Sequence, residues 1–261
     1  MKKKLTINDV IHFYLSHYCN SKEINGLATM WSEMNDIKEY YEETSNPSKA
    51  HYSVDQIVRM CVIGLYSTGH QKRLSKDSVD EAVRKILDEA IIPVDKKKYT
   101  LFHAIRKTSF HLNDFEELYE YVKELIGGVT GIGYVTIYDT ARRIGHLLKE
   151  PIYPSAYVYL HYNKVNSAAR SILPFNKLGY REPSTLFMCD FGTFPSICIE
   201  DLLCVFSDVF VNVKQTRDDA EETVQTFNKK NWRNKSLSEF VLEQSTKYKN
   251  APKAKRWSEF V

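Results

Sequence analysis

The chain has 261 residues, of which 43% are hydrophobic and 26% charged, a balance typical of soluble globular proteins. Its 36 lysines and arginines and 33 aspartates and glutamates leave a net charge of only +3, which excludes a polycation, so any nucleic-acid role must come from a local patch. The 5 cysteines form no C-x-x-C pair, which argues against a disulfide scaffold or a zinc site of standard spacing. No apolar run approaches the ~18 residues of a membrane span. We therefore expect a cytoplasmic protein without a membrane-bound part.

The first half of the chain predicts a succession of helices. Ser53 is a candidate N-cap for a central helix, Ser and Asp residues cluster before another, and Asn113 or Asp114 can cap a third. Apolar residues at helical spacing indicate helices in six segments, at 7–20, 26–44, 54–68, 75–90, 99–111 and 113–126. Two glycines at 127–128 are expected to end the last of them.

Strand-like alternation is scarce, and only 185–191 (TLFMCDF) predicts a short edge strand. The sequence therefore predicts a mainly all-α fold, a multi-helix domain with at most a short edge strand. We expect three parts: a helical N-terminal region (1–112), a helical core containing a helix-hairpin-helix (113–211), and a polar C-terminal tail (212–261).

The tail is polar and both basic and aromatic. Its last 34 residues, from Asn228, hold nine Lys or Arg and three Asp or Glu, with Trp232, Tyr248 and Trp257 interleaved. Such a segment is either a loosely docked appendage or an arm that contacts nucleic acid or a protein partner.

Residues 126–148, IGGVTGIGYVTIYDTARRIGHLL, suggest a specific hairpin between two helices. Gly131 and Gly133 flank Ile132, and glycines permit the positive φ and close approach that a short inter-helix turn requires. The backbone N–H groups that open the second helix are left without intrahelical partners in a positive dipole field. The pattern resembles the helix-hairpin-helix element of DNA-binding and DNA-repair proteins. An ordinary αα-hairpin with glycine punctuation is the alternative.

The resemblance implies sequence-independent contact with the DNA phosphate backbone. The local charge agrees, because residues 129–181 contain seven Lys or Arg and two Asp or Glu. We predict DNA as the partner, with no cofactor and no metal, and one phosphate held by the amides of the residues at 132–134. The predicted DNA-binding residues are Gly131, Ile132, Gly133, Tyr134, Arg142, Arg143, Lys164 and Arg170.

Enzymatic activity is not expected from this hairpin. The DNA glycosylases that use such an element resemble one another in a catalytic Asp further along, and in some members a Lys just after the hairpin. Here Tyr134 and Val135 follow Gly133, and nothing acidic lies between Glu150 and Glu182. Asp139 lies too close to the hairpin. It is spaced for an i,i+4 surface ion pair with the arginine at 143.

A wider region, 129–207, resembles a family of uncharacterised bacterial proteins. The resemblance rests on YDTARRIGHLL, VYLHYNKVNSAARSI and IEDLLCVF. It brings no function with it. Glu200 and Asp201 in the third motif are expected either to sit in a first helical turn, favoured by the helix dipole, or to form a salt bridge with the helix of Arg142 and Arg143.

Two other functions remain open. Arg106 and His111 have the R-x4-H spacing that resembles HEPN-type ribonucleases, in which the Arg would stabilise phosphate and the His assist proton transfer. A structural or protein-interaction module without nucleic-acid affinity is the other alternative, and the 17 tyrosines suit an interface as well as they suit base stacking.

Overall fold

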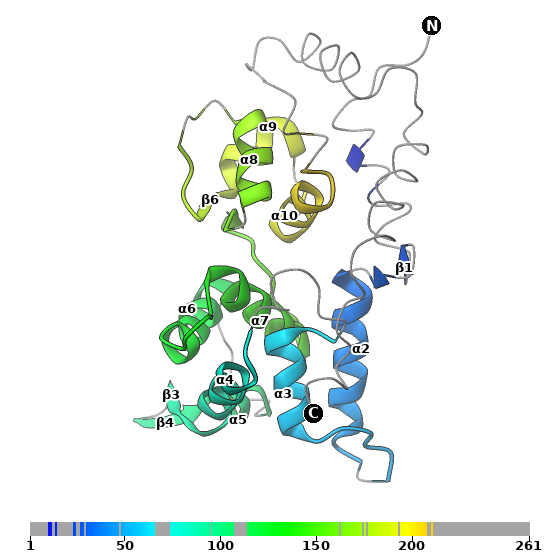
Figure 1. Cartoon of the computed structure of the whole chain (residues 1–261), viewed down its shortest axis with the longest axis vertical. Helices are drawn as coiled ribbons and strands as arrows, with labels where there is room; N and C mark the ends of the chain where they lie inside the picture. The colour runs from blue at the N-terminus through cyan, green and yellow to red at the C-terminus, as the bar shows by residue number, and fades with distance from the viewer. Residues whose placement is uncertain are drawn as a thin grey trace, which may run out of the picture. The chain divides into compact units, whose positions relative to one another are not determined.

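The structure is a computed structural model, and it divides the chain into two compact units (Figure 1). It describes residues 10–11, 14, 23–24, 27–28, 30–46, 48–65, 74–94, 96–106, 114–161, 163–173, 175, 177–192, 194–207 and 210. The described residues of 30–154 form the first unit, here the hairpin unit. Those of 10–28 and 155–210 form the second, here the α8 unit.

The hairpin unit is built mainly from helices. They are α2 (Met30–Glu43), α3 (Val54–Ile63), α4 (Lys76–Asp88), α5 (Leu101–Arg106), α6 (Phe115–Ile126) and α7 (Tyr134–Leu147). Between α4 and α5, the strands β3 (Ala90–Val94) and β4 (Lys97–Thr100) pair antiparallel, with Ile92 opposite Tyr99.

The predicted start signals of three helices are confirmed. The Ser53 hydroxyl accepts from the Gln56 amide, and the Gln56 side chain accepts from the Ser53 amide, a capping box that opens α3. Ser75 caps α4, and Asp114 rather than Asn113 caps α6 by accepting from the Glu117 amide at 2.8 Å. These local hydrogen bonds fix where each helix enters the unit.

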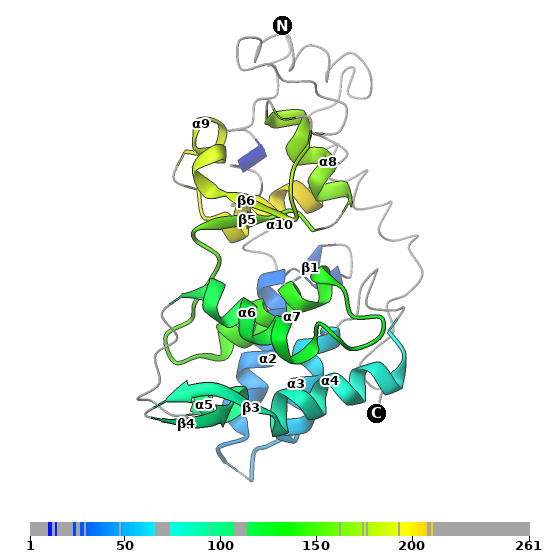
Figure 2. The same ribbon diagram turned by 90° about the vertical axis from the view of Figure 1, so that its left-hand side faces the viewer.

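Helix α7 is the centre of the hairpin unit. It packs against α2, α3 and α6, and its residues from 136 to 147 are all buried. Figure 2 shows it among the neighbouring helices. Tyr138, Ala141 and Ile144 of α7 are buried, as are Ile57 and Met60 of α3 and Leu118 and Tyr119 of α6. Because one helix is enclosed by three others, its polar side chains must find partners inside the unit.

The α8 unit contains short strands and helices. Strand β5 (Tyr157–Tyr159) pairs antiparallel with β6 (Arg181–Pro183), and helix α10 (Ser196–Val205) packs against β5 and against α8 (Asn163–Ile172). The remaining elements are β1 (Glu23–Ile24), β2 (Leu27–Ala28), the 3-10 helix η3 (Ser184–Phe187) and α9 (Met188–Phe191).

The mainly helical fold is confirmed, but the strand prediction at 185–191 is wrong. That segment forms η3 and α9, because Phe187 and Phe191, at helical i,i+4 spacing, are both buried on one side. The strands among the described residues lie instead in three antiparallel pairs. The expected boundary at 112 also differs, since α3 packs against α7 and α4 against α6 across it. The tail at 212–261 lies outside the described residues.

Candidate nucleic-acid interface

The connection between α6 and α7 is a tight turn held by backbone hydrogen bonds. The amide of Gly127 donates to the Lys123 carbonyl at 2.9 Å, and that of Val129 donates to the Ile126 carbonyl at 3.0 Å. The amide of Ile132 then donates to the Val129 carbonyl at 3.1 Å, so, contrary to the prediction, this amide already has an acceptor inside the turn. Val129 and Ile132 are buried, so the two apolar residues of the turn anchor it against the helices.

The glycines of this turn serve different purposes. Gly131 has a φ of +83°, a left-handed conformation that costs any other residue energy. It lies against the start of α4, where an added Cβ would be 3.9 Å from Leu74 Cδ2 and 4.0 Å from Ser78 Oγ. Gly128 and Gly133 have no positive φ, and an added Cβ at either would meet nothing within 4 Å. Their missing side chains therefore leave open surface.

Helix α7 begins at that open surface. Its N-cap, Gly133, has extended backbone (φ −111°, ψ −179°) and provides no side-chain hydrogen bond to the first turn. Gly133 is exposed, and the next residue, Tyr134, is 50% exposed. The positive end of the α7 dipole is thus presented at the surface beside an aromatic ring.

Arg142 lies inside the unit. It is 7% exposed, and its Nη2 lies 3.0 Å from Asp139 Oδ1 in an i,i+3 ion pair. Its Nη1 donates to Met30 Sδ at 2.7 Å, and its guanidinium carbon lies 5.4 Å from the centre of the Tyr138 ring. The predicted surface pair between Asp139 and residue 143 is therefore wrong: Asp139 is buried and pairs with Arg142.

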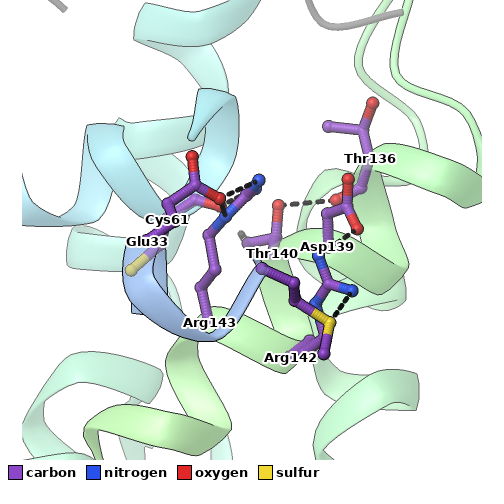
Figure 3. Close-up of polar contacts among 8 residues, drawn as sticks. Glu33, Cys61, Thr136, Asp139, Thr140, Arg142 and Arg143 are labelled. Atoms are coloured by element: carbon purple, nitrogen blue, oxygen red, sulfur yellow. Dashed lines mark hydrogen bonds and ion pairs between the residues drawn. The ribbon is translucent and has the colours of Figure 1, made fainter. Parts of the chain in front are cut away.

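Arg143 ties α7 to two other helices (Figure 3). Its side chain is 3% exposed, and its Nε and Nη2 donate to Glu33 Oε2 on α2 at 3.1 and 3.0 Å. Its Nη1 donates to the Cys61 carbonyl on α3. Gly64 lies next to this ion pair and has a φ of +79°. A Cβ added there would lie only 2.7 Å from Glu33 Oε1.

The burial of Arg142 and Arg143 changes their assignment. Both guanidinium groups are buried and contact residues of the hairpin unit, so neither is exposed to a DNA phosphate. We therefore assign both arginines a structural role. Glu200 and Asp201 are buried and belong to the α8 unit, and their predicted salt bridge to this helix stays a prediction. Both acids lie beyond the first turn of α10, and Asp201 accepts a hydrogen bond from Tyr14 Oη at 2.6 Å.

Another buried polar cluster lies near the end of α7. His146 Nδ1 is 2.6 Å from Tyr153 Oη, and its Nε2 is 3.0 Å from Asn35 Oδ1. Burial, with a smaller contribution from the Lys38 charge, lowers the pKa of His146 from 6.5 to about 4. The imidazole is therefore neutral at physiological pH, and Tyr153 stacks edge-on against Trp31 beside it. No pattern in the sequence linked these residues.

The remaining predicted site residues fall elsewhere. Lys164 and Arg170 are exposed on α8, which belongs to the α8 unit, whereas the hairpin belongs to the hairpin unit. Arg106 is the last residue of α5, and its proposed partner His111 lies outside the described residues. Lys76, which no sequence pattern indicated, is an exposed residue of the first turn of α4, between the Leu74 and Ser78 that border Gly131.

Comparison with known proteins adds no assignment. No protein-family model, curated protein or solved structure matches this chain. Within the described part of the chain, no helix is long and apolar enough to cross a membrane. In the same part, no three His, Cys, Asp or Glu side chains are grouped so that they could hold a metal ion. The geometry around α7 therefore has to support a functional proposal by itself.

Proposed function

We propose that the chain binds DNA without catalysis and without reading its base sequence, through the backbone N–H groups at the start of α7. The observation that supports this most is the N-terminus of α7, which begins at an exposed glycine without a side-chain cap. In the same unit, α3, α4 and α6 are each capped by their own Ser or Asp side chain. Helix α7 thus leaves room for an external acceptor where the other three supply an internal one.

A phosphate oxygen is the acceptor that suits this position. The first amides of a helix lack intrahelical acceptors and lie at the positive end of its dipole, so they bind anions. The open space at Gly133 allows a phosphate to approach the backbone closely, and the left-handed Gly131 with the buried Ile132 holds the turn in place. Contacts of this kind involve the DNA backbone and carry no sequence information.

Lys76 is the cation that supplements these amides. It replaces Arg142 and Arg143 in the proposed interface, because it is exposed and lies in the first turn of α4, in which Ser78 borders Gly131. Each phosphate that is neutralised by a lysine releases counterions, so we expect the affinity for duplex DNA to fall steeply as salt rises.

The test compares Gly133→Asp with Gly128→Asp by fluorescence anisotropy on labelled duplex DNA. Both positions are exposed, and each tolerates an added Cβ. Both variants also lower the net charge by the same amount. An Asp at 133 would cap α7 with its own carboxylate and repel phosphate, so we expect this variant to lose most DNA affinity. Because the new Asp also caps α7, the free energy of unfolding of Gly133→Asp should equal that of the wild type or exceed it by a few tenths of a kcal/mol.

Gly128→Asp should keep most of the affinity, because it lies outside the first turn of α7. Equal binding by both variants, or wild-type protein that binds no DNA at low salt, would show that the hairpin is only a connection between helices.

One observation favours the alternative of a protein-interaction module, namely the half-exposed ring of Tyr134 at the same surface. Under that alternative, Tyr134→Ala would weaken binding to a protein partner while no DNA binding is detected.

A further inference from the structure

Basic side chains gather on one part of the α8 unit. They are the exposed Lys164, Arg170 and Lys177 and the half-buried Arg181, all on α8 or on the segment from α8 to β6. Of the unit's described acidic residues, Glu200 and Asp201 are buried, and Asp190 is half-buried on α9. The carboxylate of Glu182 accepts a hydrogen bond from the Gly179 amide at 2.5 Å. The surface is therefore richer in positive than in negative charge.

Three tyrosines hold Arg181 in place. On the β5–β6 pair, Arg181 stands opposite Tyr159. Its guanidinium carbon lies 4.7 Å from the centre of the Tyr157 ring, 5.4 Å from that of Tyr180 and 6.0 Å from that of Tyr159. Its Nη1 also donates to Tyr159 Oη at 3.4 Å. Cation–π contacts of this kind fix the orientation of a guanidinium before any ligand arrives.

Arg170 is held on the same surface. Its Nε donates to Asn166 Oδ1 at 2.7 Å, one helical turn earlier on α8. Asn166 Nδ2 in turn donates to the carbonyl of Gly179 at 3.2 Å, two residues before Arg181. The outer side of α8 and the start of β6 are thus joined by hydrogen bonds into one surface, which we call the Arg170–Arg181 surface.

Aromatic residues are interleaved with these cations. Phe175 is 43% exposed and lies between Arg170 and Lys177 in the chain. Tyr180 and Tyr157, next to Arg181, are half-buried. Exposed aromatic rings among basic side chains are the arrangement with which proteins bind single-stranded nucleic acid, because the cations contact the backbone and the rings stack on bases.

We propose that the Arg170–Arg181 surface binds single-stranded nucleic acid, at a site separate from the hairpin. Arg170, Lys177 and Arg181 contact successive phosphates, and Phe175 stacks on a base. The ligand is an extended polyanion with unpaired bases, since charge complementarity selects phosphates and the exposed Phe175 ring needs an accessible base face. This site lies in a unit that does not contain the hairpin, so the two proposals succeed or fail independently.

The experiment measures the anisotropy of a labelled oligo(dT) of about 16 nucleotides with the full chain, at about 50 and about 200 mM salt. Phe175→Ala changes no charge and alters an exposed residue, so it should fold normally while affinity falls about fivefold or more. The double variant Arg170→Glu with Lys177→Glu should weaken binding further. The slope of the logarithm of its binding constant against the logarithm of the salt concentration should be shallower by about 1.4. The charge-matched control is Lys49→Glu with Lys149→Glu, at two exposed lysines of the hairpin unit, which should bind like wild type.

Gly133→Asp separates this site from the hairpin, and it should leave oligo(dT) binding unchanged. The proposal is overturned if wild type does not bind oligo(dT), or if Phe175→Ala and the Arg170–Lys177 double variant bind it as tightly as wild type. Loss of oligo(dT) binding in Gly133→Asp alone would assign that binding to the hairpin. The proposal is also overturned, in favour of a membrane surface, if the wild type binds phosphatidylserine vesicles but not oligo(dT) and the same double variant loses the vesicle binding.

Discussion

Arg143 and Glu33 form a buried ion pair in which two guanidinium nitrogens, Nε and Nη2, donate to the same carboxylate oxygen. The two residues are 110 positions apart in the chain, and the pair joins the central helix α7 to α2. The third nitrogen of the guanidinium, Nη1, reaches the Cys61 carbonyl on α3. A single side chain thus links three helices of the hairpin unit.

Removing one partner of this pair should destabilise the hairpin unit strongly. Glu33→Gln keeps the shape of the side chain but leaves the buried Arg143 charge without its carboxylate, and we expect a loss of about 3 kcal/mol in the free energy of unfolding. Urea denaturation followed by circular dichroism measures it. Glu42→Gln, an exposed change on the same helix, should stay within about 0.5 kcal/mol of wild type. A loss below about 1 kcal/mol at Glu33 would contradict the structural role of the pair.

Alanine substitutions at three glycines should produce graded losses of stability. Gly64→Ala combines a φ of +79° with a Cβ 2.7 Å from Glu33 Oε1, so it should cost the most, about 2 kcal/mol or more. Gly131→Ala has a φ of +83° but only ordinary contacts, and it should cost about 1 kcal/mol. Gly128→Ala has open space and no positive φ, so thermal melts should place it near wild type. A different order would show that backbone conformation at these sites is not as described.

The hairpin unit should lose stability as the pH falls from about 6.5 to about 4. The pKa of His146 is lowered to about 4 by burial, so over this range the unfolded chain binds a proton at His146 that the folded chain excludes. The contribution is fully present above pH 6.5 and decreases as pH falls. An NMR titration should show the His146 ring signals unchanged until about pH 4. Titration of His146 near pH 6.5 would refute the prediction.

Tyr14→Phe should destabilise the α8 unit. The Tyr14 hydroxyl donates to Asp201 Oδ2 at 2.6 Å, and both residues are buried, so the variant leaves a buried carboxylate without this donor. We expect a loss of about 1–3 kcal/mol in urea denaturation. Tyr134→Phe removes the same hydroxyl from a half-exposed ring and is the matched control. Equal stabilities of the two variants would mean that the bond to Asp201 adds nothing.

Local features of the sequence predicted much of the helical fold. Ser53, Ser75 and Asp114 cap helices as expected, because a cap depends on residues only three positions away. The strands were harder to predict from the sequence. The β3–β4 pair contains Pro93 and consecutive lysines, which obscure alternation, whereas the apolar spacing at 185–191 reads equally as strand or helix.

The candidate site was predicted only in part. The turn at Gly131 and Gly133 lies where the spacing indicates, but the roles of Arg142 and Arg143 depend on Met30, Glu33 and Cys61, which are far away in the chain. A pair of adjacent arginines after a glycine hairpin has the same local pattern whether the helix is exposed or enclosed. Only the packing of α2 and α3 against α7 distinguishes the two cases.

The burial of Cys61 has a kinetic consequence. Cys61 is fully buried on α3, and burial raises the pKa of its thiol to about 12, so almost no thiolate exists at neutral pH in the folded chain. Cys189, by contrast, is exposed. A thiol reagent should modify Cys189 at once and reach Cys61 only in molecules whose helices have separated. The rate of Cys61 labelling therefore measures how often the hairpin unit opens under native conditions.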